Sequence, residues 1–315
     1  MSGFRLPSWP VWLIFLGVGL VAVAAASLIY TSGTGVFATP GLLRPGGLAP
    51  QAAALLALGV LGALVSTVGM FAFVVAGSVS RRRAERGYAS LGTILACLGV
   101  AIVLANVLAI PFALIAARQD PSTLGGLTPF TLVLSVVTLD GSLLGVVYLR
   151  IVRPKVLTWE QMGLRIDKFG TRFAQGIGVG FLCLLGALGV ELILKQLGVV
   201  QTQEDLFTGF KNASLGQFIG VFLAGATIVP VCEEIFFRGY VFTAVRQRYG
   251  LAQAFVLSPV LFAAAHLNLP AFLPILAAGV ILGYVYYRTG SLVPSMVAHG
   301  VFNGLQFLAL YFGPS

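Results

Sequence analysis

Ionisable residues are rare within the apolar runs of this chain, and a few of them have types and spacings that suit chemistry. Glu233, Glu234 and Arg238 share one apolar run, while His266 and His299, the two histidines of the chain, lie in two later runs. Ionisable groups inside lipid are costly, so each needs a partner or a purpose. A carboxylate and imidazoles that meet at one place suit general acid–base chemistry on a bound water.

The spacing of the acidic run separates its two glutamates. On a helix, Glu234 and Arg238 are four residues apart and face the same side, so we expect them to form an ion pair. Glu233 points about 100° away and is left without the arginine. An unpaired carboxyl in a low-dielectric cavity suits a base that accepts and returns a proton. Pro230 removes a helical hydrogen bond one turn upstream, so we expect the backbone to open there.

The two histidine-containing runs repeat the four-residue spacing. His299 and Asn303 fall on one helical face, which places two hydrogen-bond donors side by side. Phe262 and His266 have the same spacing, so the phenyl ring is expected to pack one turn below the imidazole. Counted along helices from the expected inner membrane boundary, these polar groups and Glu233 fall about 12 to 24 Å deep. The three helices are therefore expected to bring their polar groups to overlapping depths.

The composition excludes a water-soluble globule and a disordered chain. Of 315 residues, 58% are apolar or aromatic and 9% are charged, whereas soluble domains have roughly 25% charged residues. Disordered segments are poor in apolar residues and rich in charge, which is the reverse of this sequence. The net charge of +9 does not indicate nucleic-acid binding, because the basic residues lie in short loops between apolar runs. We expect an all-α fold, a polytopic transmembrane helical bundle.

Nine apolar runs are long enough to cross a bilayer. The predicted spans are residues 10–30, 51–78, 89–117, 127–150, 173–196, 215–238, 251–268, 270–288 and 291–311. Eight spans are the alternative, because the last four runs are separated by very short loops.

The distribution of Lys and Arg predicts the orientation of these spans. With the N-terminus inside, fourteen basic residues fall on the inner side and four on the outer side, while Arg238 lies within a span. Cytoplasmic loops carry the excess of positive charge. We therefore expect a multi-pass protein of a prokaryotic plasma membrane with a cytoplasmic N-terminus.

The chain divides at a charged segment that also carries apolar residues. We expect residues 1–150 to form a four-span membrane region, 151–172 a cytoplasmic interfacial segment, and 173–315 the helical core with the paired acids and both histidines. Two pairs of glycines in the core are spaced four apart, which allows close helix approach. They are Gly176 with Gly180 and Gly216 with Gly220.

Taken together and in this order, the three motifs resemble those of the type II CAAX prenyl protease family, also called CPBP or Abi proteins. The motifs are Glu-Glu-x-x-x-Arg at 233–238 followed by glycine, Phe-x-x-x-His at 262–266, and His-x-x-x-Asn at 299–303. The resemblance covers roughly residues 173–311. It implies an intramembrane endopeptidase that depends on a glutamate and cleaves a membrane-associated or lipid-modified polypeptide.

The resemblance also implies a role for each motif residue. Glu233 would be the base that activates a water, His266 its partner in holding that water, and His299 with Asn303 the donors to the tetrahedral oxyanion. The supporting residues would be Glu234, Arg238 and Phe262. No cofactor and no metal are implied, and the partners would be the lipid bilayer and a peptide or protein substrate.

Other interpretations of the same residues stay open. Glu233, His266 and His299 have the types of a catalytic His₂Glu zinc set, although no His-Glu-x-x-His helix supports it. A structural polar cluster is a second alternative, in which the chain is a non-catalytic membrane scaffold or immunity protein. Cys232 is a weak candidate nucleophile, because helical phase turns it away from Glu233.

Asp140, near the middle of the fourth predicted span, suggests a third alternative. A buried acid there suits a proton-coupled carrier. We expect instead a protonated structural acid that is hydrogen-bonded to Ser142 or Asn106.

Overall fold

The computed structural model describes residues 89–119, 129–198, 213–266 and 268–313, together with a few separate positions between 13 and 69. Apart from those positions, the predicted spans 10–30 and 51–78 lie outside the described residues. The regular structure that is described is helical, except for an antiparallel pair of two-residue strands, β1 (Leu43–Arg44) and β2 (Gly47–Leu48). The predicted all-α fold is confirmed.

The described helices include three π-helical segments, which carry the letter η. In chain order they are α3 (Leu91–Gln119), α4 (Pro129–Val147), η4 (Tyr148–Val152), α5 (Phe169–Gln196), α7 (Leu215–Leu223), η6 (Ala224–Ile228), α8 (Val229–Glu234), η7 (Ile235–Phe242), α9 (Thr243–Tyr249), α10 (Leu251–Ala265), α11 (Phe272–Thr289) and α12 (Leu292–Phe312).

The segments from α7 to α9 join end to end as one helical run over Leu215–Tyr249. The sequence predicted a span that ends at residue 238, so the structure extends it by about three turns. The run begins at a capping box, in which the Ser214 hydroxyl accepts from the Gln217 amide and the Gln217 side chain accepts from the Ser214 amide. It ends at Gly250, whose φ of 98° suits glycine and lets the chain reverse into α10.

Five helical stretches of the described residues are long and apolar enough to cross a membrane. They are Leu91–Ala109, Phe169–Gln196, Leu215–Tyr249, Phe272–Thr289 and Leu292–Phe312. Helix α10 is apolar but shorter, with 15 residues. A multi-pass membrane protein is thereby supported, while the count of eight or nine spans stays a prediction.

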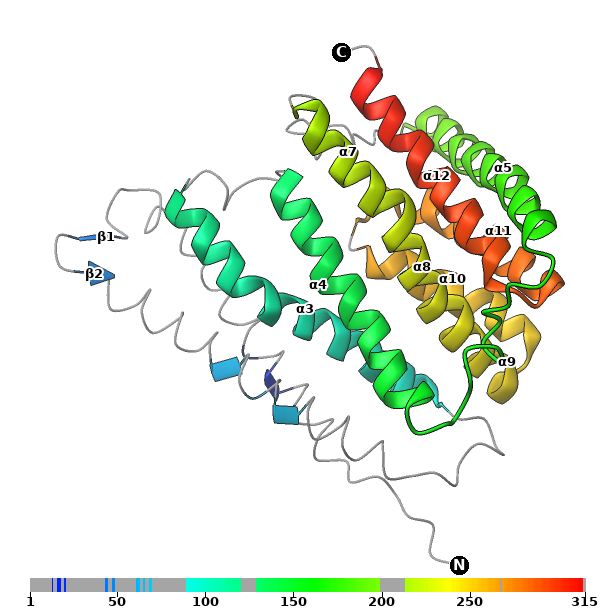
Figure 1. The fold of residues 1–315 in the computed structure, drawn as a ribbon, viewed down its shortest axis with the longest axis horizontal. Helices are drawn as coiled ribbons and strands as arrows, with labels where there is room; N and C mark the ends of the chain where they lie inside the picture. Colours follow the sequence, from blue (N-terminus) through cyan, green and yellow to red (C-terminus); the bar gives the residue numbers. More distant parts are fainter. Residues whose placement is uncertain are drawn as a thin grey trace, which may run out of the picture.

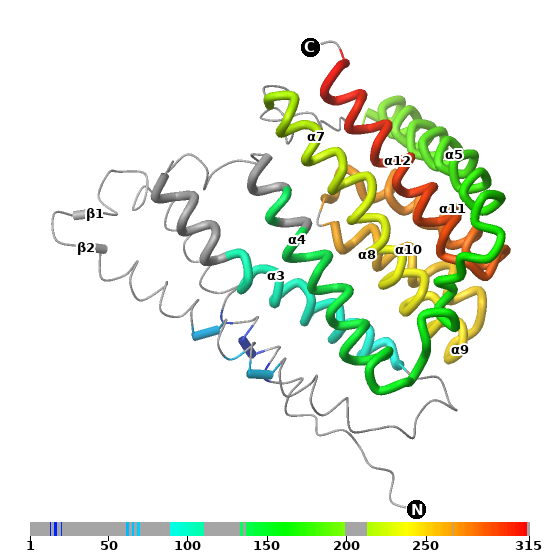
Figure 2. Tube along the Cα trace, in the orientation of Figure 1, coloured from blue at the N-terminus to red at the C-terminus, as the bar shows by residue number. Residues whose placement is uncertain are grey.

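The long run α7–α9 lies between α4 and α12, and α5 packs on the outer side of α12 (Figure 1). Helices α10 and α11 pack behind this row, and α3 packs beside α4 (Figure 2). Helices α3 and α4 share one hydrophobic core with η7. For example, the buried hydroxyl of Tyr240 lies 3.5 Å from the Cys97 sulfur. The last helices of region 1–150 are thus packed directly on the run that carries the paired acids.

The segment that follows η4 folds back under the bundle as a series of turns. Met162 is fully buried, and its carbonyl accepts from the Tyr286 hydroxyl at 3.0 Å. The Gly163 carbonyl accepts from the Leu292 amide at 2.7 Å. This segment therefore ties α11 and α12 together, and its predicted place at the cytoplasmic interface stays a prediction.

Small residues bring α5 against α12, as the spacing predicted. A Cβ atom on Gly176 would lie 2.5 Å from Val297 Cβ, and one on Gly180 would lie 2.6 Å from Val301 Cβ. The second predicted pair differs, because a Cβ on Gly216 or Gly220 would meet nothing within 4 Å. The packing of α5 thus fixes the helix that carries His299 and Asn303.

Candidate active site

The predicted ion pair of the acidic run is present and fully buried. Arg238 Nη1 lies 2.6 Å from Glu234 Oε1, and the two side chains are 1% and 0% exposed. The guanidinium also donates from Nη2 to the Gly279 carbonyl of α11 at 3.1 Å. Its carbon lies 4.4 Å from the centre of the Phe262 ring, which is a cation–π contact. Arg238 is therefore held by α8, α10 and α11 together.

His299 lies between the two glutamates. Its Nδ1 is 3.1 Å from Glu234 Oε1, and its Nε2 is 3.7 Å from Glu233 Oε2. Because the Glu234 carboxylate is paired with Arg238, it can only accept, so Nδ1 carries the proton of that hydrogen bond. A carboxylate on one ring nitrogen fixes the tautomer and the orientation of an imidazole, as in Ser-His-Asp triads. Here the second nitrogen is directed at Glu233.

Glu233 is separated from the arginine, as its helical phase predicted. Within the described residues it forms no ion pair with Arg238, and its Oε2 atom is buried without a hydrogen bond. The separation of 3.7 Å from His299 is longer than a hydrogen bond. Glu233 therefore has one carboxylate oxygen that is free to accept from a water or a substrate.

Phe262 lies between the two histidines. Its ring packs edge-on against His266, with centroids 5.0 Å apart, and against His299, at 5.5 Å. The predicted contact between Phe262 and His266 is confirmed. His266 Nδ1 lies 2.8 Å from the Phe262 carbonyl, which can only accept, so the lone pair is left on Nε2.

His266 stands at the C-terminal end of α10 and is exposed. Among the described residues, no carboxylate lies within 4.0 Å of its ring nitrogens. It is therefore His299, rather than His266, that directly faces Glu233. His266 lies on the open side of the Phe262 ring.

Asn303 lies one turn beyond His299 on α12, and its amide contacts the opened backbone of η6. Its Nδ2 donates to the Gly225 carbonyl at 3.0 Å. Pro230 has no amide hydrogen, so the carbonyl of Ala226 loses its helical donor and the backbone widens into a π-helix. The predicted opening upstream of Pro230 is confirmed. A Cβ on Gly300 would lie 2.5 Å from the Ala226 oxygen, so α12 packs directly against this opening.

Asp140 accepts no hydrogen bond from Ser142 or Asn106, so the predicted partners are wrong. The Ser142 hydroxyl donates to the Thr138 carbonyl, and the Asn106 amide donates to the Ile102 carbonyl. Each of these donors bonds to a backbone carbonyl one turn back in its own helix. This local hydrogen bond competes with a hydrogen bond to Asp140. Asp140 is only 3% exposed. It is therefore a buried acid on α4 that is not held by the two side chains predicted to bind it.

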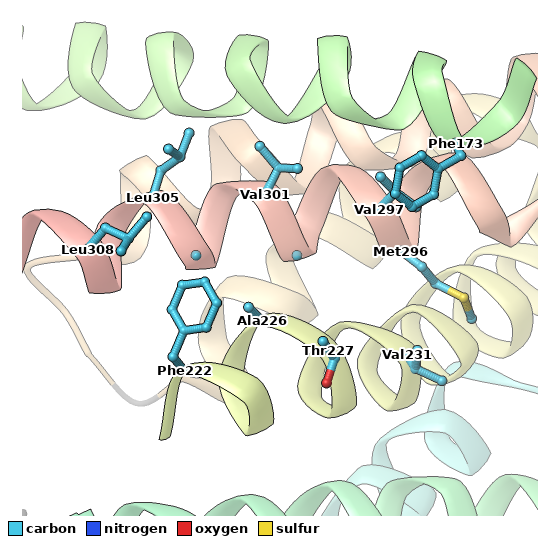
Figure 3. Close-up of a pocket in the computed structure, with 12 residues that line it drawn as sticks. Phe173, Phe222, Ala226, Thr227, Val231, Met296, Val297, Val301, Leu305 and Leu308 are labelled. Carbon is cyan, nitrogen blue, oxygen red and sulfur yellow. The ribbon is translucent and has the colours of Figure 1, made fainter. Parts of the chain in front are cut away.

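An apolar pocket of about 470 Å³ lies beside this polar site, between α5, the run α7–α8 and α12 (Figure 3). Its lining residues are Phe173, Phe222, Ala226, Thr227, Val231, Met296, Val297, Gly300, Val301, Gly304, Leu305 and Leu308. Thr227 supplies a side-chain hydroxyl to an otherwise apolar wall. Gly300 directly follows His299 and Val231 is two residues before Glu233, so the pocket is lined by other faces of the helices that carry His299 and Glu233.

No group of three or more His, Cys, Asp or Glu side chains is placed to hold a metal ion in the part of the chain that the structure describes. The alternative zinc set of Glu233, His266 and His299 is not gathered, because His266 lies on the far side of Phe262. Cys232 is a buried free thiol on α8.

Comparison with known proteins points to one family for this part of the chain. Residues 215–305 match the family model described as type II CAAX prenyl endopeptidase Rce1-like. The UPF0177 protein YxdF of Lactococcus lactis subsp. lactis (strain IL1403) is 34% identical over 77 residues, which are 24% of this chain and 42% of that relative. The chain thus matches less than half the length of this relative. No solved structure matches the chain.

Proposed function

We propose that this chain, which carries an Rce1-like type II CAAX prenyl endopeptidase domain at residues 215–305, hydrolyses a peptide bond with a water activated by Glu233. One observation carries the proposal. Glu233 is buried without an arginine partner and faces His299 at 3.7 Å, while the adjacent Glu234 is neutralised by Arg238. A base of this kind contributes about 10²–10⁴-fold to a reaction rate.

In the proposed reaction, the Glu233 carboxylate takes a proton from the water while the water oxygen attacks the carbonyl carbon. The tetrahedral intermediate then collapses as Glu233 returns the proton to the leaving amine. His266 holds the water through Nε2, which carries a lone pair because Nδ1 donates to Phe262. Water reaches the site from the exposed side of His266.

His299 and Asn303 are proposed as donors to the oxyanion. His299 can donate from Nε2 only as an imidazolium, because its Nδ1 proton is already held by Glu234. A fixed positive charge aimed at a developing oxyanion is a large source of rate enhancement.

The proposed substrate is a membrane-associated or lipid-modified polypeptide. The apolar pocket of about 470 Å³ supports this class, since it is lined by the helices that carry His299 and Glu233 and suits an apolar side chain or lipid group (Figure 3). The charge distribution of the sequence supports a prokaryotic plasma membrane with the N-terminus in the cytoplasm.

The test is cleavage of a panel of lipidated and unmodified peptides by the purified protein in vesicles, with products identified by mass spectrometry. Glu233→Gln keeps the size of the side chain and removes the base, so cleavage should fall at least about 10²-fold. Glu191→Gln is the matched control, because Glu191 is an exposed glutamate of α5. Retained cleavage by Glu233→Gln overturns the proposal. A panel that the wild type leaves uncut, but binds, favours the non-catalytic scaffold.

A further inference from the structure

Asp140 belongs to α4, which precedes the segment that matches the protease family. Helix α4 packs along α8, the short helix that ends with the paired glutamates (Figure 1). Asp140 is 3% exposed and Glu233 is 9% exposed. The charge of Glu233 acts on Asp140, and both acids act on the thiol of Cys232, which precedes Glu233 in α8. A second buried acid therefore lies on a helix that packs against the helix of the proposed base, outside the protease-like segment.

Both acids have an oxygen without a hydrogen bond. Asp140 Oδ1 and Glu233 Oε2 are buried, and no donor from the described residues reaches either atom. The nearest hydroxyl on α4, that of Ser142, donates to the backbone of its own helix. A buried carboxylate oxygen left without a donor is costly. Glu234 Oε2 is likewise buried without a donor. A proton on one of the carboxyl groups, or a water, would supply a missing donor.

The charges around the pair indicate how many protons it holds. Arg238 and Glu234 neutralise each other. The charges of His299, Glu234 and Arg238 act on Glu233, whereas the charge of Glu233 acts on Asp140. Two interacting carboxyl groups in a low-dielectric site do not both ionise, so one of them keeps a proton. His299 faces Glu233 and not Asp140, which favours Asp140 as the carboxyl that keeps it.

We propose that Asp140 holds this proton and is a positioning residue for Glu233. The protonated carboxyl donates a hydrogen bond to the Glu233 carboxylate, directly or through one water, and keeps that carboxylate ionised and oriented toward the substrate. The inference rests on the proposed function, in which Glu233 is the base. It makes α4 part of the reaction site although α4 carries none of the three motifs.

Infrared difference spectroscopy on the full-length protein in vesicles tests where the proton lies, independently of activity. At neutral pH the wild type should show the carbonyl stretch of a protonated carboxyl. Asp140→Asn should abolish this band, and Glu233→Gln should retain it. A band that is lost in Glu233→Gln but kept in Asp140→Asn places the proton on Glu233 and overturns the proposal, as does the absence of the band in the wild type.

Peptide cleavage tests the positioning role. Asp140→Leu removes the donor, so kcat should fall about 10- to 100-fold with little change in KM, because a hydrogen bond to a charged group is lost. Asp140→Asn keeps a hydrogen-bond donor, so its kcat should fall much less. Ser142→Ala, two residues further along α4, is the matched control and should behave as the wild type. Equal losses in Asp140→Leu and Asp140→Asn overturn the proposal.

If Asp140→Leu does not fold, the pH dependence of cleavage by the wild type and by Asp140→Asn provides the test. Wild-type activity should decline at alkaline pH, where Asp140 loses its proton and the second negative charge faces Glu233. Asp140→Asn cannot lose a proton and should lack this decline. A profile for Asp140→Asn that superimposes on that of the wild type overturns the inference.

The outcome for Glu233→Gln separates the two proposals. An active Glu233→Gln variant defeats the proposed function, whatever Asp140 does. An inactive Glu233→Gln variant together with unaffected Asp140 variants defeats the inference on Asp140 alone.

Discussion

His299 and Glu234 are 65 residues apart in the sequence, yet His299 Nδ1 lies 3.1 Å from Glu234 Oε1. The same oxygen accepts from Arg238 Nη1 at 2.6 Å. Glu234 is thus a buried carboxylate held by a guanidinium on one side and an imidazole on the other. The consequence is an orientation of His299 in which Nε2 faces Glu233. The two adjacent glutamates therefore have different surroundings, because Glu234 Oε1 is held by Arg238 and His299, whereas Glu233 is not bonded to the arginine.

Replacement of Glu234 by Gln should destabilise the protein strongly. The change leaves the buried Arg238 without its counter-charge, which costs about 3–5 kcal/mol when one partner of a buried pair is removed. The free energy of unfolding in mixed micelles is the measurement. Addition of Arg238→Met to Glu234→Gln should restore part of that stability, because the unpaired charge is gone. An unchanged unfolding midpoint for Glu234→Gln would contradict the structural role of the pair.

Phe262→Leu should reduce activity more than stability. The ring supports Arg238 from one face and contacts both histidines with its edges. Loss of the cation–π contact and the edge contacts should cost about 1–2 kcal/mol of stability. Since both imidazoles lose their orientation, kcat should fall while KM changes little.

The matched control for Phe262 is Phe255→Leu on the same helix. Phe255 packs against Phe242 and Tyr287, away from the histidines. Phe255→Leu should show a loss of stability similar to that of Phe262→Leu, with kcat unchanged. Equal effects of the two substitutions on kcat would mean that Phe262 acts only through general packing.

Asn303→Ala tests the proposed oxyanion donor. Removal of one such donor lowers kcat by about 10²–10³-fold, with KM largely unchanged. Gln306→Ala is the control, because Gln306 donates to the Phe302 carbonyl of its own helix and should be dispensable. If Asn303→Ala lowers the unfolding midpoint but leaves kcat intact, the amide serves only to hold the Gly225 carbonyl.

Gly180→Ala should separate α12 from α5. The added Cβ would lie 2.6 Å from Val301 Cβ and 2.8 Å from the Ala298 carbonyl, so one helix must move. Overpacking of this kind costs about 1–3 kcal/mol. Gly178→Ala is the control, because its Cβ would meet nothing within 4 Å. Activity should fall in Gly180→Ala alone, since α12 carries His299; equal activity in both variants would show that the close approach is not required.

Treatment with chelators should leave peptide cleavage unchanged. The described residues bring no three metal-ligating side chains together, and both ring nitrogens of His299 face carboxylates of the protein. Metal analysis of the purified protein, combined with activity before and after chelation, is the measurement. A loss of activity that added Zn²⁺ restores would establish the zinc set in place of the water-activating glutamate.

Relationships within single helices could be predicted from the amino-acid sequence. Composition required a membrane bundle of helices, and four-residue spacing predicted the ion pair of Glu234 with Arg238 and the contact of Phe262 with His266. Helix geometry fixes which side chains lie one turn apart, so these predictions needed no knowledge of the packing. The opening upstream of Pro230 was predicted for the same reason, because a missing amide hydrogen acts on the backbone one turn away.

Which helices meet, and which faces they present to each other, became known from the packing of the folded chain. The contacts of His299 with Glu234, of Asn303 with Gly225 and of Arg238 with Gly279 all join separate helical segments. Such contacts depend on the rotation, crossing angle and depth of each helix, which are set by how whole surfaces pack and not by local periodicity. For this reason the local partners predicted for Asp140 were wrong, whereas the packing of α4 on α8 puts Asp140 on a helix next to the one that carries Glu233.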